Sequence, residues 1–147
     1  MISTKTPAPT PAVVLDTNAV LDWLVFVDPG MANLACAITA GSVRWIASPR
    51  MREELARTLA YPALASWNPD CVRTLTSFDR WALMQAEPAS QPPKPLVCTD
   101  PDDQVFIDLA IENGARWLVS HDRALLKLEK HAIARGLSIL PPARWPG

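Results

Sequence analysis

The sequence has no long hydrophobic run and no excess of charge of either sign. No stretch of its 147 residues approaches the roughly 18 consecutive apolar residues of a membrane-spanning helix, and its first residues lack the apolar core of a secretory signal. With 49% hydrophobic and 20% charged residues, extensive disorder and a highly charged, histone-like composition are excluded. We therefore expect a cytoplasmic protein that has no membrane partner.

Cysteine and histidine are also scarce. Cys36, Cys71 and Cys98 are widely spaced and odd in number, so the sequence contains neither a disulfide framework nor the paired cysteines of a zinc site. We interpret all three as small buried hydrophobic residues. His121 and His131 show no metal-binding spacing, and no G-x-S-x-G motif supports a serine hydrolase.

The length and the distribution of proline indicate the domain organisation. The chain is long enough to form one hydrophobic core. Residues 1–11 are rich in proline and threonine and are expected to form a flexible tail, which leaves 12–147 as a single domain. The Pro-rich stretch at 88–95 is too short to separate two domains.

Short apolar runs alternate with segments of helical periodicity. We expect strands at residues 13–15, 43–47, 96–98, 117–119 and 137–140. We expect helices at residues 19–27, 31–40, 49–61, 70–86, 100–114 and 123–134. This alternation predicts an α/β fold, with a mostly parallel central sheet covered by helices on both faces.

Four acidic residues are expected at one edge of this sheet. Asp16 and Asp122 each follow directly on a strand, and ligand sites of parallel sheets lie outside the carboxyl ends of the strands. Asp103 lies in the first turn of a helix, and Glu54 lies near the start of another. The neighbouring Glu53 points away from the apolar side of its helix, which makes Glu54 the better candidate.

Carboxylates that gather in this way repel one another unless a cation neutralises them. Mg²⁺ and Mn²⁺ prefer oxygen ligands, and such a site suits metal-assisted attack of water on a phosphodiester. Each acid also has a simpler interpretation. Asp100 and Asp102 are typical helix-capping residues, Asp16 can bond a loop amide, and Glu54 can pair with an arginine of its own helix. The convergence of four acids favours the metal site.

The same segments resemble the PIN-domain family. The similar segments are Val13 to Asn18, with an Asp-Thr-Asn signature; Ser48 to Leu55; Asp100 to Ala110; and Trp117 to Asp122, with a Ser-x-Asp ending. The resemblance extends from Val13 to about Pro142. One departure is Asp22-Trp23, where many members of the family have small or apolar residues.

The resemblance implies a PIN-like three-layer α/β/α sandwich and a metal-dependent endoribonuclease, often the toxin of a bacterial toxin–antitoxin pair of the VapC kind. The products of such an endoribonuclease carry 5′-phosphate and 3′-hydroxyl ends. It implies that Mg²⁺ or Mn²⁺ is held by Asp16, Glu54, Asp103 and Asp122. Asn18 and Ser120 match supporting positions that orient these acids, and Asp100 is a candidate additional acid. A homodimer and an inhibitory antitoxin partner are also expected.

Two other classes of protein fit the sequence less well. An aspartyl-nucleophile phosphatase usually has a second aspartate at position 18, which here is Asn18, and a receiver-type phospho-acceptor needs a lysine after a late strand. A PIN-fold module that binds RNA or protein without cutting remains an open alternative.

Binding of RNA requires positive charge near the site. The net charge of −1 combines an acidic stretch at 100–112 with a basic stretch at 116–135. The arginines expected to contact RNA are Arg50, Arg52 and Arg123.

Overall fold

The computed structural model describes residues 10–89 and 96–146, so most of the predicted tail at 1–11 lies outside the described residues. Its centre is a sheet of parallel strands in the order β3-β2-β1-β4-β5. The strands are β1 (Ala12–Leu15), β2 (Arg44–Ala47), β3 (Ala82–Met84), β4 (Trp117–Val119) and β5 (Ser138–Leu140). The predicted parallel sheet is therefore confirmed.

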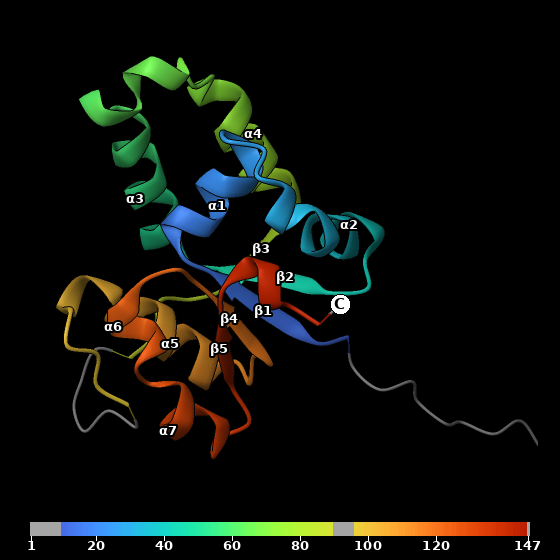
Figure 1. Cartoon of the computed structure of the whole chain (residues 1–147), viewed down its shortest axis with the longest axis vertical. Helices are drawn as coiled ribbons and strands as arrows, with labels where there is room; N and C mark the ends of the chain where they lie inside the picture. Colours follow the sequence, from blue (N-terminus) through green and yellow to red (C-terminus); the bar gives the residue numbers. More distant parts are fainter. Residues whose placement is uncertain (1–9, 90–95, 147) are drawn as a thin grey trace, which may run out of the picture.

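Helices cover both faces of the sheet and complete a three-layer α/β/α sandwich (Figure 1). One face carries α1 (Thr17–Leu24), α2 (Ala32–Ala40), α3 (Pro49–Leu59) and α4 (Cys71–Trp81). The other face carries α5 (Gln104–Glu112), α6 (Arg123–Leu126) and α7 (Glu129–Ile133). Short 3-10 turns lie at η1 (Pro29–Met31), η2 (Pro62–Trp67), η3 (Pro101–Asp103) and η4 (Pro142–Arg144).

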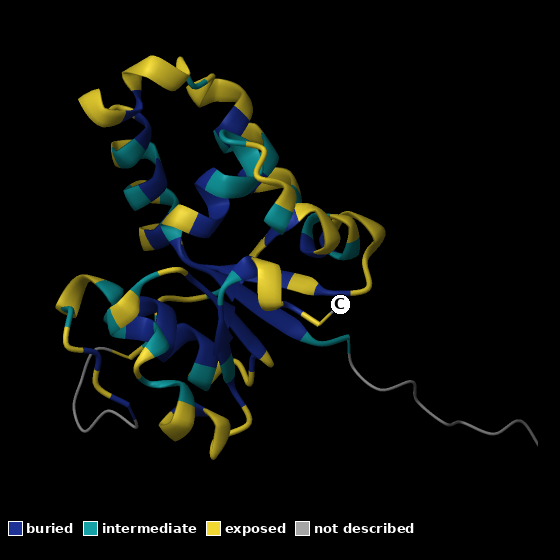
Figure 2. Cartoon of the chain, viewed as in Figure 1, coloured by how far each residue is buried: buried dark blue, intermediate teal, exposed yellow. Residues whose placement is uncertain are grey.

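The strands form the interior of the molecule, as parallel strands with helices on both sides must. All four residues of β1 and all three of β4 are buried, whereas the outer sides of the helices and two residues of the edge strand β3 are exposed (Figure 2). On the α1–α4 face, the Trp45 ring lies 5.5 Å from that of Trp23 and 4.9 Å from that of Phe78. These aromatic contacts hold α1 and α4 against β2.

The edge strand β3 was not predicted, and the predicted strand at 96–98 does not form. Ala, Leu and Met favour helices, so the sequence predicted that the helix of α4 would continue to 86. Instead α4 ends at Trp81, and Leu83 pairs with Ile46 of β2. In the segment 96–98, the backbone bonds to the side chain of Gln104 and not to a strand: Cys98 N donates to Gln104 Oε1 (2.7 Å), and Gln104 Nε2 donates to the carbonyl of Leu96 (2.8 Å).

Two further expectations were wrong. The helix expected at 123–134 is broken into α6 and α7, with Leu128 N bonded to the carbonyl of Leu125 in a tighter turn. Cys36 and Cys71 are exposed, because they lie on the outer sides of α2 and α4, and Cys98 is the buried one.

The strand order places β1 beside β4 at the centre of the sheet. From β1 the chain proceeds outward through β2 to β3 on one side, and from β4 it proceeds to β5 on the other. The connections leave these two central strands toward opposite faces, which opens a crevice at their carboxyl ends. In the described ranges no single helix is long and apolar enough to cross a membrane; only α1 together with Pro29–Ala40 meets the requirement, across a bend of 105°.

Candidate metal centre

Asp16 lies at the carboxyl end of β1, where its side chain begins α1. Its Oδ1 accepts a hydrogen bond from the backbone N–H of Ala19 (2.8 Å), and its Oδ2 accepts one from the hydroxyl of Ser120 at the end of β4. The Ser120 oxygen in turn accepts the backbone N–H of Asp122 (2.8 Å). Ser120 thus joins the ends of two adjacent strands.

Burial dominates the electrostatics of Asp16, which is only 3% exposed. Burial raises the pKa of Asp16 from 3.8 to about 6, although the hydrogen bonds from Ser120 and Ala19 lower it. The nearby carboxylate of Asp122 raises the pKa further. A cation beside Asp16 would favour its charged form.

Asp103 and Asp122 bring two more carboxylates to this crevice, and Asp100 joins them. These three acids each place a carboxylate oxygen within 4.8 Å of the others. Burial raises the pKa of Asp103 from 3.8 to about 7, with a further contribution from the Asp122 carboxylate. Asp103 Oδ2 is buried and has no hydrogen-bond partner in the described part of the chain. A buried oxygen of this kind is costly unless a ligand contacts it.

Glu54 approaches from α3. It is partly buried, whereas Glu53 is exposed, as the helical positions predicted. Burial raises the pKa of Glu54, and the nearby charges of Arg57 and Asp102 act in opposite directions on it. All four predicted acids line one cleft of about 280 Å³, formed by Asp16, Thr17, Asn18, Glu54, Thr58, Tyr61, Asp103, Phe106 and Asp122.

This donor set fits a hard divalent cation. The four acids of the cleft and Asp100 offer carboxylate oxygens, the ligands that Mg²⁺ and Mn²⁺ prefer. The unpartnered oxygen of Asp103 and the raised pKa values of Asp16 and Asp103 point to the same need for positive charge. The cleft can therefore hold a divalent ion.

The supporting residues differ in what they contact. Ser120 bonds to both Asp16 and Asp122, as an orienting residue would. Asn18 is exposed and lines the cleft, but its side chain makes no hydrogen bond to another described residue. Asp100 has both of the roles considered for it, because it lies in the acidic group and also accepts the backbone N–H of Asp102 (3.0 Å).

The three arginines expected at an RNA surface lie in different surroundings. Arg50 and Arg123 are exposed at the starts of α3 and α6. Arg52 forms a two-pronged ion pair with Asp79 of α4, at 2.6 Å and 2.9 Å. The Arg52 guanidinium therefore connects α3 to α4.

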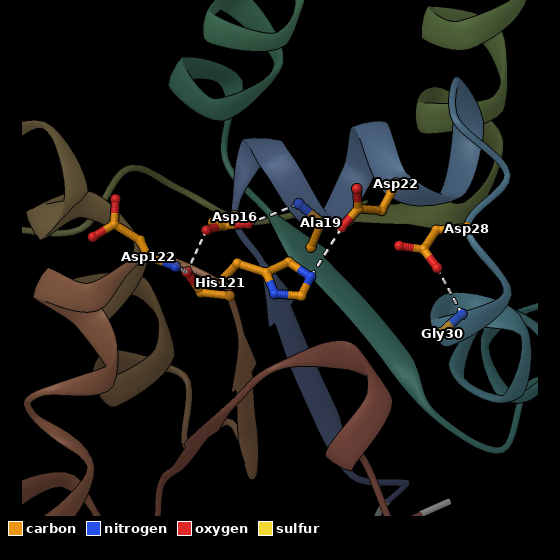
Figure 3. Close-up of polar contacts among 8 residues, drawn as sticks. Asp16, Ala19, Asp22, Asp28, Gly30, His121 and Asp122 are labelled. Carbon is orange, nitrogen blue, oxygen red and sulfur yellow. Dashed lines mark hydrogen bonds and ion pairs between the residues drawn. The ribbon is translucent and has the colours of Figure 1, made fainter.

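The contact between His121 and Asp22 was not predicted from the sequence. His121 Nε2 lies 3.2 Å from Asp22 Oδ2, on the side of the Ser120–Asp122 segment that faces α1 (Figure 3). Burial raises the pKa of Asp22, and the His121 imidazole lowers it. The one feature of the sequence that pointed to this contact was the charged residue at position 22, where many members of the family have a small or apolar residue. Thr58 and Tyr61 also line the cleft without having been predicted.

Comparison with known proteins agrees with this arrangement of acids. Residues 12–124, more than half of the chain, match the PIN domain. A search of curated proteins gives no significant match. The matched range contains β1, the α3 helix, the α5 helix and the Ser120–Asp122 segment, and thus all four predicted acids. The chain belongs to the PIN-domain family.

Proposed function

We propose that this protein is a metal-dependent endoribonuclease that hydrolyses RNA phosphodiester bonds to 5′-phosphate and 3′-hydroxyl ends. The observation that carries the proposal is the cleft in which four carboxylates from four separate segments meet. One of them has a buried oxygen with no hydrogen-bond partner among the described residues. Membership of the PIN-domain family supports a nuclease. We infer that the substrate is RNA and that the ion is Mg²⁺ or Mn²⁺ from the acids of the cleft and from the family.

The residues of the cleft have distinct tasks in this reaction. Asp16, Glu54, Asp103 and Asp122 would hold Mg²⁺ or Mn²⁺. When bound, the ion supplies positive charge for the scissile phosphate and lowers the pKa of water. Ser120 holds the Asp16 carboxylate and the Asp122 backbone in place before substrate arrives. This fixed arrangement lowers the cost of ordering the site during catalysis.

The bond changes define the products. The oxygen of water forms a bond to phosphorus, and the bond between phosphorus and O3′ breaks. One proton leaves the attacking water, and O3′ takes up a proton as it departs. The downstream fragment keeps the phosphate on its 5′ end, and the upstream fragment ends in a 3′-hydroxyl.

The biological role is part of the same proposal. We infer that the protein acts in the cytoplasm as the toxin of a toxin–antitoxin pair, as a homodimer that a partner protein inhibits. Family membership is the support for this role. A small upstream open reading frame with a DNA-binding pattern would favour it.

The cleavage test compares the wild-type protein with Asp16→Asn. With mixed RNA and Mn²⁺, we expect the wild type to cut and the variant to lose at least about 100-fold in rate, because a carboxylate that contacts the ion is gone. Labelling of the fragment ends checks the 5′-phosphate. Equal cleavage by both proteins would point to a contaminant, and no cleavage by either in any divalent metal would favour the PIN-fold binding module.

A further inference from the structure

The arginines of α3 lie on two sides of the helix. Arg52 Nε and Nη2 donate to the two carboxylate oxygens of Asp79 on α4. Arg50 and Arg57 instead line a groove of about 730 Å³ between α3 and the start of α5. Neither of these two guanidinium groups forms an ion pair or hydrogen bond with another described residue. They are therefore available to an anion, whereas Arg52 is occupied.

This groove adjoins the acidic cleft. The same two segments border both: on α3, Glu53 lines the groove and Glu54 the cleft, and on the other side Gln104 lines the groove and Asp103 the cleft. A strand whose scissile phosphate lies among the acids can therefore continue into the groove.

Arg50 and Arg57 flank Glu54 along the helix. They stand four residues before it and three residues after it, which places all three on one side of α3. With a rise of about 1.5 Å per residue, the two arginine backbones are roughly 10 Å apart. Both guanidinium charges lower the pKa of Glu54, so their field reaches this acid of the cleft.

Two of the acids in the groove are engaged in bonds within the protein. Glu87 Oε1 accepts the backbone N–H of Arg50 (3.2 Å), and Asp108 Oδ1 accepts from Gln104 Nε2 (2.9 Å). The third acid, Glu53, is exposed and also lines the groove. It stands three residues after Arg50 and four before Arg57, so this edge of the groove carries two positive charges and one negative charge.

We propose that Arg50 and Arg57 bind phosphates of the RNA strand that flank the scissile bond, and that Arg52 does not. The inference rests on the proposed endoribonuclease function and adds a path for the substrate. The ligand is the sugar–phosphate backbone, so these contacts add affinity without selecting a base sequence. In this proposal Arg57 contacts RNA, whereas the sequence had predicted that Arg52 would.

The test measures RNA affinity against salt concentration in Asp16→Asn protein, so that RNA stays intact. Arg50→Gln, Arg57→Gln, Arg52→Gln and Lys130→Gln are compared by fluorescence anisotropy on a labelled 12-nucleotide RNA. Lys130→Gln, on the distant α7, is the charge-matched control. For single strands each phosphate contact contributes about 0.7 to the slope of log K against log salt.

We expect Arg50→Gln and Arg57→Gln each to reduce that slope by about 0.7, which corresponds to about fivefold weaker binding at 0.1 M salt. Arg52→Gln and Lys130→Gln should keep the slope of the parent. The inference fails if all four slopes agree, or if Arg52→Gln loses as much as Arg57→Gln. If the parent does not bind RNA and the wild type does not cut it, the proposed function itself is overturned.

Discussion

Ser120 fixes two acids of the cleft through a single hydroxyl group. It is fully buried, it donates to Asp16 Oδ2, and it accepts the backbone N–H of Asp122. Its hydrogen bond also counteracts the rise in the pKa of Asp16 that burial causes. Ser48 provides a contrast, because it is equally buried at the end of the neighbouring strand β2, and its hydroxyl has no hydrogen-bond partner among the described residues.

The substitution Ser120→Ala should weaken Mn²⁺ binding and RNA cleavage by about 10- to 100-fold, the usual effect of losing a group that orients a metal ligand. Calorimetric titration with Mn²⁺ and single-turnover cleavage measure the two effects. The pH at which cleavage reaches half its maximum should also rise, since a bond that lowers the pKa of Asp16 is lost. Ser48→Ala is the matched control and should retain both properties; equal losses in the two variants would contradict the orienting role.

At the scale of elements, the segment after β4 is bonded to both of its neighbours. Ser120 donates to Asp16 and Asp122 lines the acidic cleft, whereas His121 faces α1 and contacts Asp22 (Figure 3). The side chain of Asp22 is 15% exposed and that of His121 is 52% exposed, so solvent partly screens this pair. The contact holds α1, which Asp16 begins, against the segment that carries Asp122.

We expect Asp22→Asn to weaken Mn²⁺ binding several-fold, because α1 and the segment after β4 are no longer held in register. A double-mutant cycle with His121→Gln should give a coupling of about 0.5 kcal/mol in urea unfolding, as for a partly exposed pair. Asp28→Asn is the control, since Asp28 bonds to the backbone of Gly30 and not to His121. Additive effects of Asp22→Asn and His121→Gln would show that the two residues act separately.

These contacts also show how far the sequence determines the site. Asp16, Asp122 and Glu54 could be chosen from strand ends and from helical position, both of which are local, whereas the choice of Asp103 within the acidic run at 100–103 came from the resemblance to the PIN-domain family. All four line the cleft. The pairs His121–Asp22 and Arg52–Asp79 depend on how α1 packs beside the segment after β4, and how α3 packs on α4. Such packing joins residues far apart in the chain, so no local pattern predicted either pair.

The strands, too, could be predicted only where a local pattern of the sequence determines them. The strands β1, β2, β4 and β5 were expected within a residue or two, because their apolar runs lie between clear turn and helix signals. The strand β3 consists of good helix formers, and only its pairing with β2 makes it extended. The stretch 96–98 is apolar like a strand, but Gln104 supplies the hydrogen bonds that a neighbouring strand would have supplied.

At the scale of the whole molecule, the acidic cleft opposes folding when no cation is bound. The folded-state pKa values of Asp16, about 6, and Asp103, about 7, lie above the ordinary value of 3.8. The folded protein therefore binds protons more tightly than the unfolded chain at these positions. Their contribution to stability is fully present below about pH 4 and is lost as the pH rises through 6 and 7.

The free energy of unfolding of the metal-free protein should accordingly fall between pH 5 and pH 8, and Asp103→Asn should reduce this fall because the amide does not ionise. At pH 8, Mg²⁺ or Mn²⁺ should raise the melting temperature of the wild type, since an ion that binds only the folded state stabilises it. Asp103→Asn should lose most of that rise, whereas Asp102→Asn, at an exposed neighbouring acid, should keep it. Urea unfolding in EDTA at several pH values and thermal melting with added metal test both statements. A wild-type protein that becomes more stable from pH 5 to pH 8 without metal would show that the cleft acids do not control its stability.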